Sequence, residues 1–361
     1  MVRVTVKLRP SKTQRRELDR WLWHLTGIYN WAIRLLELGW KDRMPLSLFD
    51  LTGRAARSGV RLGVPGDVVQ GAIKMAHRSW ESFRGGHVKR PKLRGQRHRL
   101  NSIEISARVL RVEGGRLNFV GMREGMRYHH QPGLGLIDAL ADMPKERLRG
   151  GRLIKRGSGW YLSVIADVEP IPVKPVAEGE VGIDLGFARL ATLSTGEVIE
   201  HPRELAAASE RIGQAQRGGH RKLTARLRER QANRIKDRNH KLSRRLVAEN
   251  RLIVVSKDNL AGMARTRFGK SVAGAGHAQL RAMLAYKCRA GGREYVEASN
   301  FKSTQTCSAC GAITGPRGKS GLAVRAWECA ACGAAHDRDV NAAVNTLRLG
   351  AGQAHEIRNV A

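Results

Sequence analysis

The sequence predicts an α/β protein that combines a small β-barrel with a mixed domain and an inserted four-cysteine zinc ribbon. Three observations lead to this prediction. Segments of alternating apolar and polar residues recur in the first half of the chain, which is typical of half-buried strands. A buried strand carrying an acid opens the second half, and two Cys-x-x-Cys pairs lie close together near its end. A chain of 361 residues has room for two or three such domains.

The composition is strongly basic. The chain has 65 Lys and Arg residues against 32 Asp and Glu, a formal net charge of +33. A charge this large opposes compact folding unless a polyanion neutralises it, so nucleic acid is the expected partner. A membrane partner is disfavoured, because the sequence shows neither a long apolar run nor a lipidation motif. Since the first residues lack the apolar core of a signal peptide, we expect a reduced, cytoplasmic and nucleoid-associated protein.

The N-terminal region begins with an alternating segment, residues 2–8, which predicts a half-buried strand. A capping box of the type Ser-x-x-Gln starts at Ser11 and opens a helix with apolar residues at helical spacing. We expect Trp21 and Trp31 of this helix in the core, as is usual for tryptophans at that spacing. For Trp23 we keep two interpretations, core packing and stacking on a nucleic-acid base.

Residues 51–64 are rich in Gly and Arg and show little periodicity, whereas residues 68–83 have the pattern of an amphipathic helix. A cationic, glycine-containing loop follows and suits phosphate contacts that carry no sequence information. The candidate contacts in this loop are Arg90, Lys92 and Arg94.

Residues 103–119 and 152–168 alternate and contain turns, which predicts a small antiparallel sheet or barrel. The prolines at 170, 172 and 175 form a linker and mark a domain boundary.

The second half opens with the buried strand 181–186, which carries Asp184, and two short strands follow up to residue 199. Three consecutive strands with an acid on the first are typical of the start of an RNase H-like domain, and also of ATP-binding kinase folds. Residues 211–249 form a long basic helix or helical pair with too few acids to balance it, so we expect it to line a nucleic-acid channel. Its candidate contacts are Arg221, Lys222, Arg226, Arg230, Arg234 and Lys241.

The cysteines predict a structural metal site. Cys307 and Cys310 form the first pair, and Cys329 and Cys332 form the second pair about 18 residues later, within the spacing of four-cysteine ribbons. A closed shell of four thiolates stabilises a fold and performs no chemistry. Disulfides are disfavoured because nothing indicates secretion. The fifth cysteine, Cys288, is expected to be a buried thiol on a helix.

Taken together, these motifs resemble the TnpB family, the RNA-guided nucleases of bacterial insertion sequences, also known as OrfB-type transposases and related to type V CRISPR effectors. The resemblance covers almost the whole chain and rests on residues 8–12 with 29–31, 182–186, 240–243, 303–311 and 336–343. It implies a wedge β-barrel (1–10 and 91–172), a helical recognition lobe (11–90), a RuvC-like nuclease domain of the RNase H type (175–306 and 335–361) and a zinc-ribbon insertion (307–334).

The resemblance also implies a reaction and partners. Such proteins use a guide RNA from the end of their own transposon, and they hydrolyse double-stranded target DNA with magnesium. The protein grips the nucleic-acid backbone and a short adjacent motif, while base pairing reads the target. A DNA-joining transposase is disfavoured, because the chain has no tyrosine nucleophile motif next to paired histidines.

The resemblance implies three acids around two magnesium ions, and this chain departs from that pattern. Asp184 matches the first acid and Asp339 the third, but Ser256 stands where the second, a glutamate, is normally found. Serine is neutral and a poor magnesium ligand. Another carboxylate could fill the vacant position, with Glu297 the better candidate and Asp258 the other. Alternatively the site is inactive and the protein binds DNA without cutting it, or two acids support slow nicking.

The residues beside Asp339 have alternative roles. Asp337 and Arg338 are candidate catalytic helpers, and Arg338 is equally a candidate phosphate contact or ion-pair partner of Asp337. His336 is expected to be structural, because four cysteines already complete the zinc shell.

Overall fold

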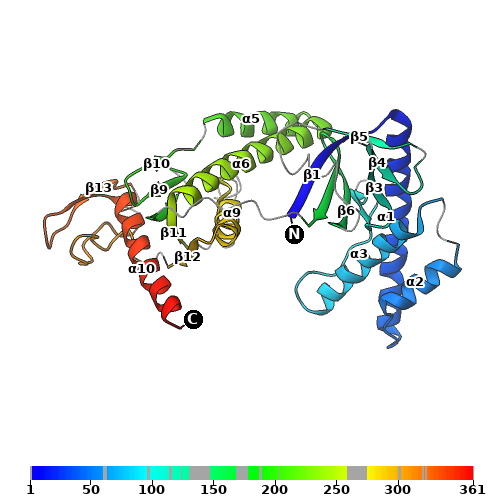
Figure 1. Cartoon of the computed structure of the whole chain (residues 1–361), viewed down its shortest axis with the longest axis horizontal. Coiled ribbons are helices and arrows are strands. Elements are labelled where there is room, and N and C mark those ends of the chain that lie inside the picture. Colours follow the sequence, from blue (N-terminus) through cyan, green and yellow to red (C-terminus); the bar gives the residue numbers. More distant parts are fainter. Residues whose placement is uncertain are drawn as a thin grey trace. The chain divides into compact units, whose positions relative to one another are not determined.

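The structure is a computed structural model, and it divides into two compact units, residues 1–169 and 170–361 (Figure 1). The division falls at the proline-rich linker, whose prolines lie outside the described residues. No helix in the described part of the chain is long and apolar enough to cross a membrane. The described residues are 2–59, 63–95, 98–113, 116–122, 124–129, 147–167, 178–186, 189–201, 203–257, 275–299, 302–318, 321 and 323–360.

The first unit contains a seven-stranded sheet with the order β2-β6-β7-β1-β5-β4-β3, and every neighbouring pair is antiparallel. The predicted antiparallel sheet is thus confirmed. The order leaves β2 and β3 at the two ends, and no strand pair joins them within the described residues, so a closed barrel is not observed there. The strands are β1 (Val2–Arg9), β2 (Ser102–Ile105), β3 (Leu110–Glu113), β4 (Arg116–Phe119), β5 (Met126–Tyr128), β6 (Leu148–Arg156) and β7 (Gly159–Ala166).

Three helices accompany this sheet: α1 (Lys12–Lys41), α2 (Leu48–Arg57) and α3 (Gly66–Arg84). The predicted capping box of α1 is present, since the N–H of Gln14 donates to Ser11 Oγ over 3.2 Å and the N–H of Ser11 donates back to the Gln14 side chain over 2.9 Å. Helix α2 was not predicted. It is only ten residues long and buries two side chains, Leu51 and Ala55, although its own capping box was readable at Ser47.

One hydrophobic core joins these helices to the sheet. Trp21 and Ile28 of α1 lie in the same buried cluster as Ile103, Leu117 and Met126 of the strands. Trp21 is 1% exposed, so its predicted core position is confirmed. The parts expected as a separate recognition lobe and barrel therefore fold around shared apolar contacts.

The second unit contains a five-stranded sheet with the order β10-β9-β8-β11-β12. β8, β11 and β12 are parallel, while β9 and β10 are antiparallel to their neighbours. The three strands predicted at the start of this domain are therefore neighbours in the sheet. The strand that carries Asp184, β8, is the middle strand of the five. They are β8 (Gly179–Leu185), β9 (Ala191–Leu193) and β10 (Val198–Ile199), followed by β11 (Asn250–Ser256) and β12 (Glu294–Ala298).

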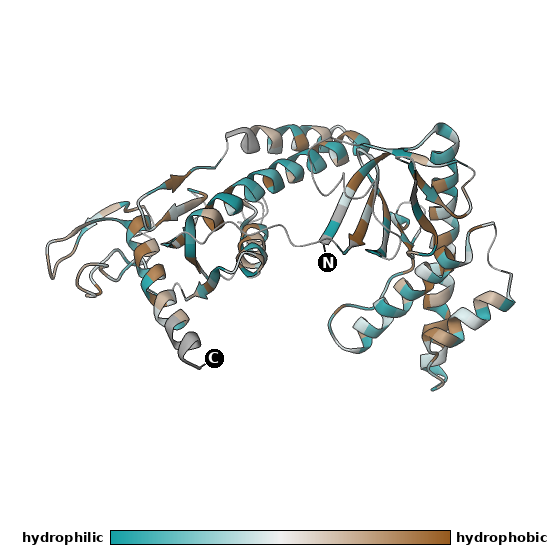
Figure 2. Ribbon diagram, viewed as in Figure 1, coloured by the Kyte–Doolittle hydropathy of each residue, from teal (hydrophilic) through white to brown (hydrophobic). Residues whose placement is uncertain are grey.

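Helices cover both faces of this sheet (Figure 1). α6 (Arg221–Glu249) and α9 (His277–Ala290) pack on the face that carries Ile183 and Val255, and α10 (Arg338–Val360) packs on the face that carries Leu252 and Val254. The predicted basic helical pair is α6 with α5 (Arg203–Arg217), and Figure 2 shows α6 hydrophilic along most of its length.

Glycines let α10 approach the sheet closely. A Cβ atom added to Gly182 of β8 would overlap the carbonyl oxygen of Ala343, and one added to Gly350 of α10 would overlap the Val254 side chain. This contact fixes the helix directly over the strand that carries Asp184.

Candidate metal centre and nuclease site

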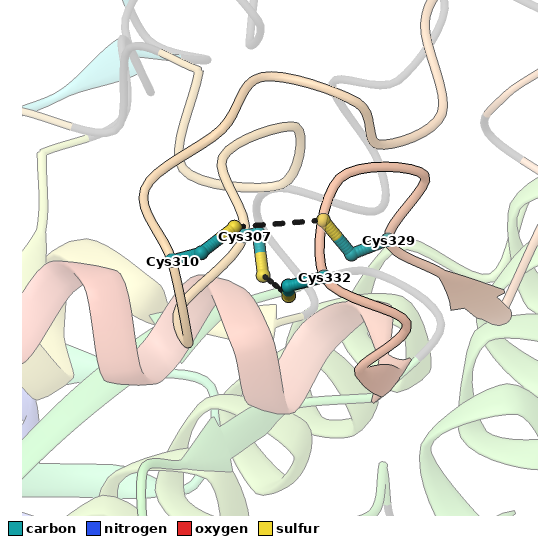
Figure 3. A group of neighbouring side chains, drawn as sticks. All are labelled: Cys307, Cys310, Cys329 and Cys332. Atoms are coloured by element: carbon teal, nitrogen blue, oxygen red, sulfur yellow. Dashed lines mark hydrogen bonds between the residues drawn. The ribbon is translucent and has the colours of Figure 1, made fainter.

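Two loops bring four cysteines together. The sulfur atoms of Cys307, Cys310, Cys329 and Cys332 all lie within 4.8 Å of one another. Figure 3 shows the four side chains pointing toward one another, one pair from each loop. Four sulfurs at this separation can hold a metal ion such as zinc.

The two loops have the same local geometry. The N–H of Gly311 donates to the Cys307 carbonyl over 2.9 Å, and the N–H of Gly333 donates to the Cys329 carbonyl over 2.8 Å. Both glycines have a positive φ, +80° and +69°, which other residues adopt only with strain. The sequence motif Cys-x-x-Cys-Gly thus folds into a matched pair of turns, or knuckles, that aim their sulfurs at one point.

His336 adjoins the cluster without being needed to complete it. It lies on the second strand of a small hairpin, β13 (Ala326–Glu328) and β14 (Ala335–Asp337). Its Nε2 is 3.0 Å from Cys307 Sγ, and its ring packs 4.8 Å from the ring of Trp327.

The first knuckle is fastened to helix α10 by two buried asparagines. Asn341 accepts a hydrogen bond from the N–H of Ser308 over 2.8 Å and donates one to the Thr306 carbonyl over 2.8 Å. Asn345, one turn later, donates to the carbonyls of Ser303 and Thr306 over 2.8 and 2.7 Å. The start of α10 and the metal cluster are therefore one hydrogen-bonded structure.

The first candidate acid points to the face of the sheet that α10 covers, and the third lies in α10 itself. Asp184 is half-buried on β8, two residues after Gly182, so both point to the side covered by α10. Asp339 lies in the first turn of α10, and 16% of its side chain is exposed.

Two arginines that the sequence analysis did not single out pair with Asp339. Arg325, beside β13, lies 3.2 Å from its carboxylate, and Arg189, between β8 and β9, lies 3.5 Å from it. No spacing rule pointed to these arginines, since they come from separate segments. The only signal was that a largely buried acid, such as Asp339 at the start of α10, needs a cation nearby.

Asp337 has a structural position at the N-terminus of α10. Its Oδ1 accepts hydrogen bonds from the N–H groups of Asp339 and Val340 over 2.9 and 3.0 Å, and Arg189 lies 3.1 Å from its Oδ2. Burial raises the pKa of Asp337, but these hydrogen bonds and the arginine outweigh burial and lower it. Asp337 is thus the N-cap of the helix. Its predicted partner Arg338 instead donates to the Gly321 carbonyl over 2.9 Å.

Ser256 ends strand β11 next to the acid-bearing strand. Its side chain is fully buried, and its Oγ accepts a hydrogen bond from the N–H of Leu185 over 3.2 Å. The residue at the expected position of the second acid therefore lies beside Asp184, and it is neutral.

Glu297 is not brought together with Asp184. Its register partner is Val255, which belongs to the core on the α6 and α9 face, opposite the face of Asp184. There Glu297 accepts hydrogen bonds from Arg281 Nε over 3.2 Å and from the Tyr295 hydroxyl over 2.8 Å. Burial raises the pKa of Glu297, but these two partners lower it overall. The other candidate, Asp258, lies outside the described residues.

Within the described ranges, the cysteine cluster is the one group of three or more His, Cys, Asp or Glu side chains close enough to share a metal ion. No third carboxylate among the described residues therefore lies close enough to Asp184 and Asp339 to share a metal ion with both.

The predicted cationic contacts differ in whether they are exposed or already paired within the protein. In the first unit, Arg90 forms an ion pair with Glu37, Lys92 is exposed, and the Arg94 guanidinium lies over the Tyr29 ring at 5.1 Å. On α6 the candidates are exposed, and one of them pairs with Asp237 over 2.8 Å. These exposed side chains are Arg221, Lys222, Arg226, Arg230, Arg234 and Lys241.

The sequence was compared with protein families and with known proteins, and the matches concern transposases and RNA-guided endonucleases. Residues 163–267 match a family described as "Probable transposase", and residues 277–346 match the "Cas12f1-like, TNB domain". A protein of Streptomyces pristinaespiralis named as a candidate RNA-guided DNA endonuclease is 31% identical over 296 residues, covering 78% of this chain and 71% of that protein.

A Mycobacterium tuberculosis protein named in the same way is 27% identical, over 78% of this chain and 67% of that protein. Among solved structures, Cas12f1 in its complex with guide RNA and target DNA matches with a TM-score of 0.59 at 15% identity, covering 91% of this chain and 82% of that one. At this identity the structural match shows a shared fold.

Proposed function

The chain belongs to the TnpB family, and we propose that it is an RNA-guided endonuclease that hydrolyses target DNA with magnesium. The observation that supports this proposal best is the position of α10. The helix packs through Gly182 onto β8, so that Asp339 in its first turn and Asp184 belong to one face of the sheet. Retained acids on one face of such a sheet suit metal-dependent phosphodiester hydrolysis.

In this proposal Asp184 and Asp339 hold magnesium, because carboxylate oxygens are the ligands that this ion prefers. Magnesium bound there would help deprotonate water and would stabilise the leaving oxygen. Arg189 and Arg325, which pair with Asp339, would orient its carboxylate before the ion binds. Asp337 fixes the first turn of α10 through its two backbone hydrogen bonds.

We assign zinc to the four-cysteine cluster. The closed set of four sulfurs leaves no position for a reacting water, so the ion would stabilise the fold alone. Through Asn341 and Asn345 it would also fix the start of the helix that carries Asp339.

The partners in this proposal are a guide RNA from the transposon end and double-stranded target DNA. The exposed cations of α6 carry the electrostatic part of binding, which is independent of sequence. Base pairing with the guide would then supply the specificity.

A second candidate function is guided DNA binding without cleavage, as in a repressor. It is favoured by two observations. Ser256 occupies the expected position of the second acid with its hydroxyl bonded to the sheet, and Glu297 lies on the opposite face. Two carboxylates hold two magnesium ions less well than three, so cleavage could be lost while binding persists.

One experiment separates the two candidates. The protein is purified with RNA transcribed from its flanking DNA, and it is offered a matched DNA target with magnesium. The variants are Asp184→Ala, Asp339→Ala and Ser256→Glu. Asp237→Ala, an exposed acid on α6, is the matched control.

The endonuclease proposal expects cutting by the wild type and by Asp237→Ala, and none by the Asp184 or Asp339 variants. Each variant should still bind the guide RNA. Binding without cutting by the wild type, with cutting gained in Ser256→Glu, would replace this proposal with the guided-binder function. If no form binds RNA or matched DNA, both candidates are wrong.

A further inference from the structure

Helix α1 carries an open, aromatic-lined cleft that the nuclease site does not use. Trp23, Gly27 and Trp31 are spaced four residues apart, so they follow one another along one side of the helix. A rise of about 1.5 Å per residue places the two tryptophans about 12 Å apart along the axis, with the glycine midway. The cleft has a volume of about 520 Å³.

The glycine keeps this cleft open. A Cβ atom added to Gly27 would meet no other atom within 4 Å. Trp23 is 54% exposed, whereas Trp31 packs partly against the core. A glycine costs helix stability relative to alanine, so its presence between two tryptophans suits a requirement for space rather than for folding.

The opposite wall of the cleft is cationic and held in place. The backbone of Arg94 is gripped by the Asn30 side chain, which donates to its carbonyl over 2.9 Å and accepts from its N–H over 2.8 Å. Arg94 and Arg99 line the cleft, and no carboxylate lines it within the described residues.

Two buried polar atoms at this cleft have no hydrogen-bond partner within the described part of the chain. They are His24 Nδ1 and Arg94 Nε. Buried polar groups are normally paired with protein or water, so these two atoms are available to a bound ligand or to water.

From this arrangement we propose that the Trp23–Gly27–Trp31 cleft binds one unpaired nucleobase of a single-stranded nucleic acid. The base stacks on a tryptophan over Gly27, and Arg94 and Arg99 contact its phosphates. Aromatic rings beside guanidinium groups are the usual means of binding single strands, because every base has a flat face to stack. The absence of carboxylates matches the charge of the strand.

The inference extends the proposed function, since it places a single-strand contact in the first unit. It does not depend on cleavage and is tested by binding alone.

The probe is a short fluorescent single-stranded RNA, and its anisotropy is followed as the full-length protein is added. A DNA strand of the same sequence tells whether the base comes from RNA or DNA. An abasic strand of equal charge reports phosphate contacts alone. Raised salt suppresses nonspecific binding.

The variants are chosen so that a folding defect cannot imitate the result. Trp23→Ala removes the exposed ring, and Trp23→Phe keeps a ring. Gly27→Leu fills the cleft while favouring the helix, so its melting temperature should not fall. Trp40→Ala is the matched control, because Trp40 lies on the same helix with 53% exposure and has Arg84 over its ring.

We expect Trp23→Ala and Gly27→Leu to bind the base-bearing strand about fivefold to 100-fold more weakly, the usual effect of losing one stacked base. Trp23→Phe should retain most of the affinity, Trp40→Ala should behave as wild type, and the abasic strand should not distinguish the variants. Equal loss with the abasic strand, equal loss in Trp40→Ala, or wild-type binding by Gly27→Leu would each overturn the proposal. These outcomes are independent of whether the protein cuts DNA.

Discussion

The hydroxyl of Ser256 accepts a hydrogen bond from the backbone N–H of Leu185, the residue that directly follows Asp184. Serine at this position is thus a part of the sheet, joining the end of β11 to the end of β8. Ser256 therefore has a structural role of its own besides replacing the expected acid.

Replacing Ser256 with alanine should therefore lower stability. The change removes an acceptor from a buried N–H group, which costs about 1 kcal/mol or slightly more. Urea unfolding of the full chain measures the loss. Ser209→Ala, at an exposed position on α5, should leave the midpoint almost unchanged. Equal midpoints for Ser256→Ala and wild type would contradict the assigned bond.

Glu297 should behave as a structural acid. Glu297→Gln weakens the ion pair with Arg281, so we expect a loss of about 1–2 kcal/mol at neutral pH. The pKa of Glu297 is lowered in the folded protein, so its contribution is present above the unfolded value and is lost as pH falls below it. The gap in unfolding free energy between wild type and Glu297→Gln should therefore shrink in acid.

The same variant tests the alternative role of Glu297 as the displaced catalytic acid. If the wild type cuts DNA, Glu297→Gln should cut at a comparable rate when assayed well below its melting temperature. Complete loss of cutting with unchanged folding would show that Glu297 reaches the site after all.

Asn341 should couple the metal site to α10. Asn341→Ala leaves the buried N–H of Ser308 without its acceptor, at a cost of about 1–3 kcal/mol, yet it removes no cysteine. We expect one zinc per chain by atomic emission in wild type and in Asn341→Ala, and none in Cys310→Ser. Exchange of amide hydrogens at the start of α10 should be faster in both variants. Loss of zinc from Asn341→Ala would instead place this asparagine among the residues needed for metal binding.

Stability should fall in mild acid because of His277. Burial lowers the pKa of this histidine to about 4, from an ordinary value of 6.5, and its Nε2–H donates to the Leu190 carbonyl over 3.2 Å. Below pH 6.5 the histidine binds a proton in the unfolded chain but stays neutral in the folded chain, so stability declines by about 3 kcal/mol toward pH 4. His277→Gln should flatten this decline in denaturant unfolding, while the exposed His220→Gln should preserve it.

Much of the second unit could be predicted because its signals are local. A run of apolar residues around Asp184 predicted a buried strand, and the cysteine spacing predicted a cluster whose sulfurs do meet. The capping box at Ser11 likewise depends on residues three apart, and it formed as expected.

Features that depend on long-range register could not be predicted. The sequence placed Glu297 near the end of a strand, but the pairing of that residue with Val255 decides which face its side chain takes. A shift of one residue would have turned it toward Asp184. The ion pairs of Arg189 and Arg325 with Asp339 could not be predicted either. These residues meet only after the sheet and the cysteine loops have assembled.

If the proposed zinc and magnesium ions both bind, the asparagines of α10 make the two sites depend on each other. Asn341 and Asn345 tie the thiolate cluster to the helix that positions Asp339, although no side chain would serve both ions. Coupling of this kind is reciprocal: whatever orders the start of α10 also tightens the hold on the structural ion. Under the proposed function, shortage of zinc in the cell would then lower magnesium-dependent cleavage, and binding of a target would slow the loss of zinc.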